Sequence, residues 1–217
     1  MNKEFVKKII YYLWVINGYL GLRSGLQISH PLTILITYYN PVRLKHVNHE
    51  LRNLLKCEFV EKVVISSHNP SIKIDDYIKV SDPRLILLNH SVRHGCGHRW
   101  MVADQFSPEY LIVMDDDILL FPWQLRKLFL ALIAEPDLPH SFAGMVKQPN
   151  GFLEYHQKTE RSVDYICEIY AITGKHLKHY IQLKDQIQKN PGPAKSIEFT
   201  EDFIIVSRIG DMQLKIR

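Results

Sequence analysis

Cysteine, long apolar runs and charge of one sign are all scarce in this sequence. The three cysteines, at positions 57, 96 and 167, are odd in number and far apart, so they define no disulfide framework and favour a reducing compartment. Lys and Arg exceed Asp and Glu only by 27 to 23, which gives no argument for nucleic acid as a partner. There are no repeats, and 46% hydrophobic residues exclude a disordered or fibrous chain. The 217 residues suit one domain.

The N-terminal segment is apolar but too short to span a bilayer. Residues 9–22 read IIYYLWVINGYLGL and follow three lysines. A span needs about 20 apolar residues, and this run is interrupted at Asn17 and lacks a small-residue cleavage site. We interpret residues 1–30 as an apolar or amphipathic segment and linker that precedes a domain of residues 31–217. Residues 5–22 are expected to pack on that domain or to lie on a membrane surface.

Two expectations follow from this division of the chain. The protein should be cytoplasmic or peripheral to a membrane, with the Golgi lumen as the alternative if the chain is eukaryotic and the segment is an anchor. The regular pattern begins at Pro31, so removing residues 1–28 should leave a folded domain.

From Pro31 onward, short apolar runs alternate with segments of helical spacing. The runs predict buried strands, at residues 32–36, 63–65, 84–88 and 110–114. The segments between and after them predict helices, from Pro41 onward, over 98–106 and over 123–134. This alternation is typical of a mostly parallel sheet with helical crossovers.

The pattern weakens after residue 140. Residues 141–146 and 165–173 are typical of strands, 175–188 of a helix, and 197–209 form a mixed segment. We therefore predict a single α/β, Rossmann-like domain whose C-terminal half is less regular.

Three adjacent aspartates, Asp115, Asp116 and Asp117, follow the most apolar strand in the sequence YLIVM-DDD-ILLF. Like charges a few Å apart repel by about 4 kcal/mol per pair at an effective dielectric of 20. In an extended chain Asp115 and Asp117 face one side, with Cα atoms roughly 6.5–7 Å apart, and can share a hard divalent cation. A surface turn is the alternative, but apolar residues follow at once. At the carboxyl end of a strand, the triplet predicts metal or phosphate binding.

A turn with two glycines precedes the helix predicted from residue 98. Its backbone N–H groups, with Arg93 or Arg99, can hold phosphate oxygens. The alternative is that Arg99 only anchors the helix. His94, Cys96 and His98 alternate and could offer three ligands to zinc in an extended chain. A structural zinc takes four ligands in paired groups, however, and no second pair is evident, so we favour phosphate.

Four spaced motifs resemble those of the glycosyltransferase-A fold. They are TYYNP after the first strand, SSHNP after the second, the acidic triplet, and a late Glu-Asp pair in FTEDFIIV. The exostosin-type glycosyltransferase domain has a similar DDD after an apolar strand and a comparable late segment. The resemblance covers residues 31–209. It implies a metal-dependent hexosyl- or N-acetylhexosaminyltransferase that moves a sugar from a nucleotide-sugar donor, usually a UDP-sugar, to a glycan or other hydroxyl acceptor.

In enzymes of this kind Mn²⁺ or Mg²⁺ bridges the donor diphosphate to the acidic motif. The resemblance makes Asp117 the direct metal ligand. Asp115 supports it directly or through the sugar and ribose, and Asp116 stands beside them at the donor. A divalent cation stabilises the charge on the departing diphosphate by several kcal/mol.

The resemblance also places the loops after the first two strands at the nucleotide. Thr37, Tyr38 and Asn40 belong to the first loop, TYYN, where an aromatic side chain stacked on a base contributes about 1–3 kcal/mol. Ser67 and Asn69 belong to the second. Ordinary loop chemistry before a proline-started helix is the alternative for both. Related enzymes carry an acidic residue near the second loop to hold the base, and SSHNP contains none.

Glu201 and Asp202 are the candidate catalytic carboxylates. From the residues alone they are equally well explained as first-turn acids of a helix capped by Thr200. The resemblance places Asp202 near the acceptor hydroxyl or the anomeric carbon, where an inverting enzyme uses it as a general base. The exostosin-type group retains anomeric configuration.

Two other functions fit the same residues. An acidic cluster that binds metal and phosphate also serves nucleotidyl or phosphoryl transfer. Because the second loop lacks the acidic residue of related enzymes, a module that binds a nucleotide sugar without turnover is the other alternative.

Asp202→Asn should separate catalysis from donor binding. If Asp202 is catalytic, transfer falls by at least roughly 100-fold, while donor affinity in Mn²⁺ barely changes because that affinity depends on the triplet. If Asp202 only faces a helix N-terminus, the variant loses about 0.3–1 kcal/mol of stability and keeps full activity. Turnover and melting temperature measured on one sample distinguish the two results.

Overall fold

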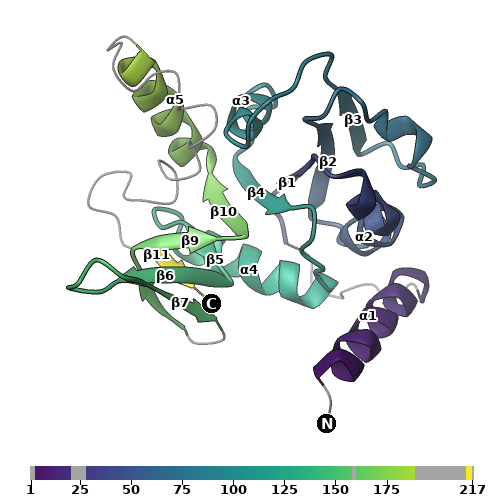
Figure 1. The fold of residues 1–217 in the computed structure, drawn as a ribbon, viewed down its shortest axis with the longest axis horizontal. Coiled ribbons are helices and arrows are strands. Elements are labelled where there is room, and N and C mark those ends of the chain that lie inside the picture. Colours follow the sequence, from purple (N-terminus) through teal and green to yellow (C-terminus); the bar gives the residue numbers. More distant parts are fainter. Residues whose placement is uncertain (1–2, 21–27, 158–159, 189–213, 217) are drawn as a thin grey trace.

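The computed structural model describes residues 3–20, 28–157, 160–188 and 214–216 (Figure 1). This part of the chain forms an eight-stranded sheet in the order β3-β2-β1-β4-β10-β5-β11-β8 and a three-stranded sheet in the order β7-β6-β9. In chain order, the described elements are α1 (Lys3–Tyr19), β1 (Leu32–Tyr38), the 3₁₀ helix η1 (Pro41–His46), α2 (Val47–Leu54), β2 (Val60–Ser67), η2 (Ile74–Asp76), β3 (Leu85–Asn89), α3 (His98–Asp104), β4 (Tyr110–Asp115), α4 (Pro122–Ala134), β5 (His140–Ser141), β6 (Ala143–Lys147), β7 (Leu153–Gln157), β8 (Arg161–Val163), β9 (Tyr165–Cys167), β10 (Ile169–Thr173), α5 (Gly174–Gln188) and β11 (Leu214–Ile216).

The first half of the fold confirms the predicted parallel sheet. β1 pairs in parallel with β2 on one side and β4 on the other, and β2 pairs in parallel with β3. Each of these strands overlaps one of the four predicted apolar runs. The burial pattern of β1 is almost continuous, as expected for a strand covered on both faces.

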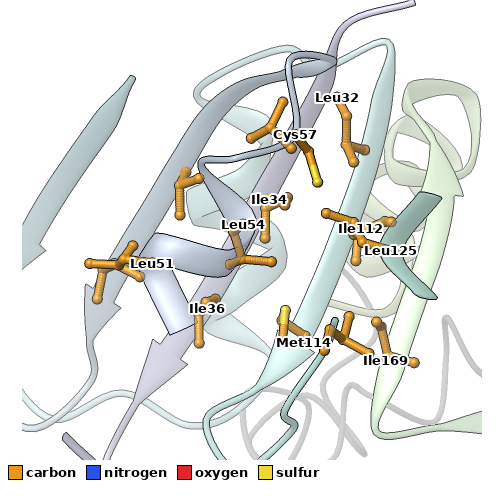
Figure 2. Packing of buried hydrophobic residues seen from close by; sticks show 14 of the residues in the cluster. Leu32, Ile34, Ile36, Leu51, Leu54, Cys57, Ile112, Met114, Leu125 and Ile169 are labelled. Carbon is orange, nitrogen blue, oxygen red and sulfur yellow. The ribbon is translucent and has the colours of Figure 1, made fainter. Parts of the chain in front are cut away.

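Helices cover both faces of this sheet. Successive side chains of each strand point to alternate faces. Leu32, Ile34 and Ile36 of β1 belong to the core beneath α2 and α4, where Figure 2 shows them with Leu51 and Leu54. On the opposite face, the odd-numbered residues of β1 and β4 meet α3 and α5 in a second cluster, which includes Leu35, Leu111, Val113, Trp100 and Tyr180.

The second half is less regular, as predicted. β10 runs antiparallel to β4, and the large sheet continues through the two- and three-residue strands β5, β11 and β8. In the small antiparallel sheet, β6 is the central strand and pairs with β7 on one side and β9 on the other. The sequence analysis missed β7 and β8 because both are short and mostly exposed, so neither has an apolar run. The predicted mixed segment, residues 197–209, lies outside the described residues.

Helix α1 packs on the domain through Trp14. The Trp14 side chain is 0% exposed, and its Nε1 donates a hydrogen bond to the Leu120 carbonyl oxygen (2.8 Å). On α2, Asn53 bonds α1 twice, accepting from Asn17 Nδ2 at Oδ1 (2.7 Å) and donating to the Trp14 carbonyl oxygen (3.1 Å). The expected packing of this segment on the domain is therefore present, and folding of the chain without residues 1–28 stays a prediction.

The outer face of α1 carries exposed apolar side chains, which include Phe5, Ile9, Ile10, Tyr12, Leu13 and Ile16. None of the helices described here has both the length and the apolar character needed to cross a membrane.

Trp14→Ala should lower the free energy of unfolding by about 3–5 kcal/mol, because it opens a large cavity and leaves the Leu120 carbonyl oxygen without its donor. Tyr12→Ala is the matched control on the same helix, since Tyr12 is 63% exposed and its loss should change stability by about 0.5 kcal/mol or less. Urea denaturation measures both. Equal, small effects would show that α1 does not contribute to the core.

Candidate functional site

The candidate site lies at the point where the order of the strands in the sheet reverses, between β1 and β4. β2 and β3 follow β1 on one side, whereas β4 pairs with the other side of β1, in the register Thr37↔Asp115. In open α/β sheets the crevice outside the carboxyl ends of such strands binds ligands. A cavity of about 450 Å³ lies at this place, which is within the size range of small-molecule sites.

The cavity combines residues from both strand ends and from the loop before α3. Residues proposed from the sequence that line it are Thr37, Tyr38, Asn40, Arg99, Asp115 and Asp116. It is also lined by Tyr39, Arg43, His68, His94 and Cys96. The structure thus brings together the first loop, the triplet and the turn before α3.

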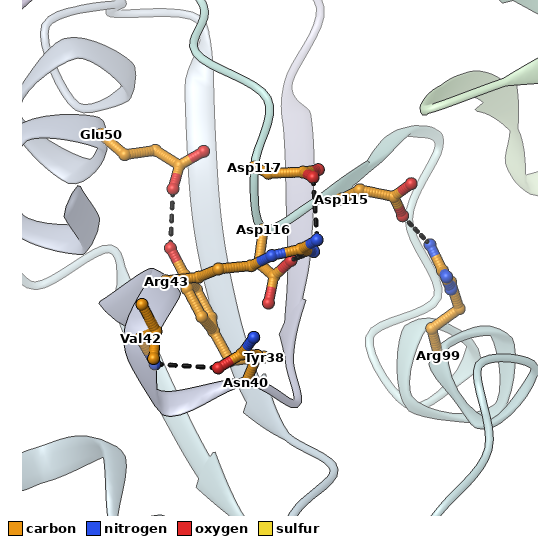
Figure 3. A network of polar contacts seen from close by, with 9 residues as sticks. All are labelled: Tyr38, Asn40, Val42, Arg43, Glu50, Arg99, Asp115, Asp116 and Asp117. Atoms are coloured by element: carbon orange, nitrogen blue, oxygen red, sulfur yellow. Dashed lines mark hydrogen bonds and ion pairs between the residues drawn. The ribbon is translucent and has the colours of Figure 1, made fainter. Parts of the chain in front are cut away.

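We had expected the acidic triplet to continue the strand in an extended conformation, but it does not. Asp115 ends β4, and the chain turns immediately, with Ile118 N donating to the Asp115 carbonyl oxygen (3.2 Å). The carboxylate of Asp115 accepts from Arg99 Nη1 of α3 (2.8 Å; Figure 3). Asp117, which is 51% exposed at its side chain, instead pairs with Arg43. The extended-chain geometry that placed Asp115 and Asp117 on one side is therefore wrong.

Arg43 neutralises the other two carboxylates. Its Nη1 pairs with Asp116 Oδ1, and its Nη2 lies 3.0 Å from Asp117 Oδ2. Asn40 helps to set this position, because its Oδ1 accepts from Val42 N (3.0 Å) and caps the 3₁₀ helix that carries Arg43. The repulsion within the triplet is thus offset by two arginines from different elements.

A buried carboxyl group lies behind the triplet. Tyr38 OH donates to Glu50 Oε2 of α2 (2.8 Å), and both side chains are buried (Figure 3). The pKa of Glu50 is raised to about 8, chiefly by burial and also by the nearby charges of Asp116 and Asp117, while the Tyr38 hydrogen bond opposes the rise. Glu50 is therefore largely neutral at neutral pH. Tyr38 is held away from solvent as part of the cavity wall.

The donor set fits a hard divalent cation. Carboxylate oxygens are the ligands that Mn²⁺ and Mg²⁺ prefer, and Asp115 and Asp116 offer them in the cavity lining, with Asp117 next to them in the chain. Burial raises the pKa of Asp116, and its ion pair with Arg43 opposes that shift. Asp115 and Asp117 are less buried and would be the residues to hold the cation.

The second loop supports the first. Ser67 Oγ donates to the Asn69 carbonyl oxygen (2.9 Å), and Asn69 Nδ2 donates to the Tyr39 carbonyl oxygen (3.0 Å). Ser67 and Asn69 are not among the described residues that line the cavity. Their contacts fix the shape of the first loop.

Tyr39 and Arg93 form a stacked pair beside the cavity. The Arg93 guanidinium carbon lies 4.8 Å from the centre of the Tyr39 ring, and Tyr39 is 40% exposed. Tyr39, rather than the buried Tyr38, is therefore the aromatic residue of this loop with a ring face near solvent.

Histidines also gather at the site, where His68 and His94 line the cavity. The turn before α3 brings His94 and His98 into a stack with ring centres 3.6 Å apart, so they do not alternate with Cys96 as an extended chain would require. His68 lies against them and is buried. The pKa of His68 is lowered to about 3, chiefly by burial and also by the neighbouring histidines and Arg99.

The sequence analysis missed Arg43, Glu50, His68 and His90. Glu50 had a usable signal, because it lies on the face of α2 that also carries Val47, Leu51 and Leu54. Arg43 and the histidines had none, since their partners are distant in sequence. Glu201 and Asp202 lie outside the described residues.

Glu50→Gln should flatten the pH dependence of stability. The folded pKa of Glu50, about 8, is higher than its ordinary value of 4.5, so its contribution is complete below about pH 4.5 and is lost as pH rises toward 8. The parent should lose up to about 1.4 kcal/mol of unfolding free energy per pH unit in this window relative to the variant. Urea denaturation near pH 5.5 and pH 7.5 in chelator measures the difference. Parallel profiles would contradict a buried, neutral Glu50.

Comparisons with known proteins identify the fold. No family model matches the chain, and no curated protein matches it in sequence. The crystal structure of GalNAc-T7 with UDP, GalNAc and Mn²⁺ matches all of this chain with a TM-score of 0.62 at 11% identity, and the chain spans 51% of that protein. CMP:2-keto-3-deoxy-manno-octonic acid synthetase complexed with CTP matches 86% of this chain and 89% of its own, with a TM-score of 0.54 at 13% identity. This protein has a Rossmann-like, glycosyltransferase-A-like α/β fold.

Proposed function

We propose that the protein is a metal-dependent glycosyltransferase that uses a nucleotide-sugar donor, in the first place a UDP-sugar, and a glycan or other hydroxyl acceptor. The observation that supports it best is the acidic triplet at the carboxyl end of β4, beside a cavity at the reversal point of the sheet. The fold neighbour GalNAc-T7 was solved with UDP and Mn²⁺.

The charges of the site suit a metal-bound diphosphate. Three aspartates face two arginines, which leaves one negative charge to attract a divalent cation. We propose that Asp117 and Asp115 hold Mn²⁺ or Mg²⁺, which would stabilise negative charge on the departing diphosphate. Arg99 and Arg43 lie in the cavity wall, where their guanidinium groups can also contact phosphate oxygens.

The first loop is proposed to hold the nucleoside. Tyr39 offers a ring face to a base, and Arg93 stacks behind that ring. Thr37, at the end of β1, lies opposite Asp115 and can contact the ribose or phosphates. Asn40, Ser67 and Asn69 would act through the conformation of the loops.

The proposed residues and chemistry of the acceptor side rest on the resemblance alone. Asp202 and Glu201 remain the proposed catalytic carboxylates. Membership of the exostosin-type subgroup and transfer of a hexosyl or N-acetylhexosaminyl group also remain proposals.

Nucleotidyl transfer is the second candidate. It is favoured by the fold likeness to CMP:2-keto-3-deoxy-manno-octonic acid synthetase, a structure that contains CTP. A glycosyltransferase should slowly release UDP from a UDP-sugar in Mn²⁺ without acceptor, whereas a nucleotidyltransferase should release pyrophosphate from a nucleoside triphosphate. A binding module should bind UDP and release neither product.

Asp117→Asn should keep the fold and weaken Mn²⁺-dependent UDP binding by at least roughly tenfold, or about 1.4 kcal/mol, because it removes a charged ligand. Asp137→Asn is the matched control, since Asp137 is an exposed carboxylate paired with Lys175 (2.7 Å) away from the cavity. Calorimetric titration with UDP, with and without Mn²⁺, measures both. Unchanged affinity in Asp117→Asn would refute the assignment of the acidic site.

We also propose that α1 makes peripheral contact with a membrane through its exposed apolar side chains and the neighbouring lysines, Lys7 and Lys8. The chain should co-sediment with anionic vesicles more than with neutral ones, and Phe5→Ser with Ile9→Ser should reduce this binding. Equal recovery of parent and double variant with anionic vesicles would contradict the proposal.

A further inference from the structure

Four histidines from three segments meet beside the acidic site. His68 follows β2, His90 follows β3, and His94 and His98 flank the turn that begins α3. Every pair of these imidazole rings is in contact. From the sequence alone, no second ligand pair for zinc is evident here. The fold supplies that pair in His68 and His90.

Three of these histidines already have the spacing of a metal site. One ligand nitrogen from each of His90, His94 and His98 lies within 4.8 Å of the others. A tetrahedral ion with bonds of about 2.0–2.1 Å keeps its ligand atoms roughly 3.3–3.4 Å apart, so side-chain rotations that close about 1.4 Å would complete the coordination.

The fourth histidine is buried against this group and has an unused nitrogen. His68 is 3% exposed, and its Nε2 has no hydrogen-bond partner among the described residues. A buried polar atom without a partner is uncommon in a folded protein. The ring centre of His68 lies 5.3–6.0 Å from the other three. Four imidazoles around one ion have ring centres roughly 5 Å apart, so His68 needs only a small movement to become the fourth ligand.

The surroundings of His90 and His94 resemble those of metal ligands. Ser66 Oγ lies 2.9 Å from His90 Nε2; when that nitrogen donates, Nδ1 keeps the lone pair that binds metal. Backbone hydrogen bonds join the loops, from His94 N to the His68 carbonyl oxygen (3.2 Å) and from His68 N to that of Tyr38 (2.9 Å). The ligand-bearing segments are therefore held together by the backbone itself.

We propose that His68, His90, His94 and His98 bind one imidazole-preferring transition-metal ion, Zn²⁺ in the first place, at a site distinct from the acidic triplet. The two sites differ in chemistry, because imidazole nitrogen suits Zn²⁺ and carboxylate oxygen suits Mn²⁺ or Mg²⁺. With four protein ligands, the ion is structural and fixes the loop that leads into α3. That helix carries Arg99, the partner of Asp115, so the ion also holds this wall of the cavity in place. The proposal does not depend on the proposed transferase function.

The test uses the full chain, stripped of metal with a chelator and titrated with ZnCl₂ alone by calorimetry. The parent should bind one Zn²⁺ per chain. His94→Ala and His98→Ala should each weaken binding by more than the roughly 10- to 100-fold that loss of an outer-shell partner costs. His179→Ala, an exposed histidine on α5, is the matched control and should bind as the parent does. Asp117→Asn should also bind Zn²⁺ normally, which separates this site from the acidic one.

Two further measurements keep the test decisive if a ligand variant is poorly folded. Ser66→Ala retains all four histidines and should weaken Zn²⁺ binding by roughly 10- to 100-fold through the loss of its contact with His90. Co²⁺ bound to the parent should give the intense visible absorption of a tetrahedral complex, and Zn²⁺ should displace it. The proposal is overturned if the parent binds no Zn²⁺ or if His94→Ala and Ser66→Ala both bind as tightly as His179→Ala.

Discussion

The parallel pairing of β1 with β4 is the constraint on which the site depends. Its register places Thr37 beside Asp115, so the loop after β1 and the acidic triplet after β4 leave the sheet at the same edge. The apolar side chains of both strands are buried on both faces, and a one-residue slip would exchange those faces. The hydrophobic core therefore fixes where the polar groups of the cavity meet.

The end of β4 divides the triplet between two partners. Asp115, the last residue of the strand, meets Arg99 from α3, whereas Asp116, in the turn that follows, meets Arg43 beside α2. Each arginine thus links the acidic edge to a helix on a different face of the sheet. This arrangement offsets the repulsion among the three adjacent carboxylates and still leaves one negative charge to attract a cation.

The histidine cluster and the acidic triplet both contribute residues to one cavity, but the sequence reveals them differently. Three acids in a row after an apolar strand are recognisable because the residues that act together are adjacent. His68 and His90 lie 22 residues apart and come together only because β2 and β3 are neighbours in the sheet, with Ser67 opposite Asn89. No local spacing rule for zinc could have found that set.

The sequence by itself determined the elements whose causes are local. Apolar runs gave the four parallel strands, Pro41 and Pro122 gave two helix starts, and the triplet marked the edge of the sheet at which the cavity lies. Only the tertiary structure decided which side chains meet there. Arg43, Glu50 and His68 acquire their partners through strand order and helix packing, and the burial of Trp14 joins α1 to the domain despite the break in pattern before Pro31. Such contacts depend on long-range burial and register, which the pattern of nearby residues does not contain.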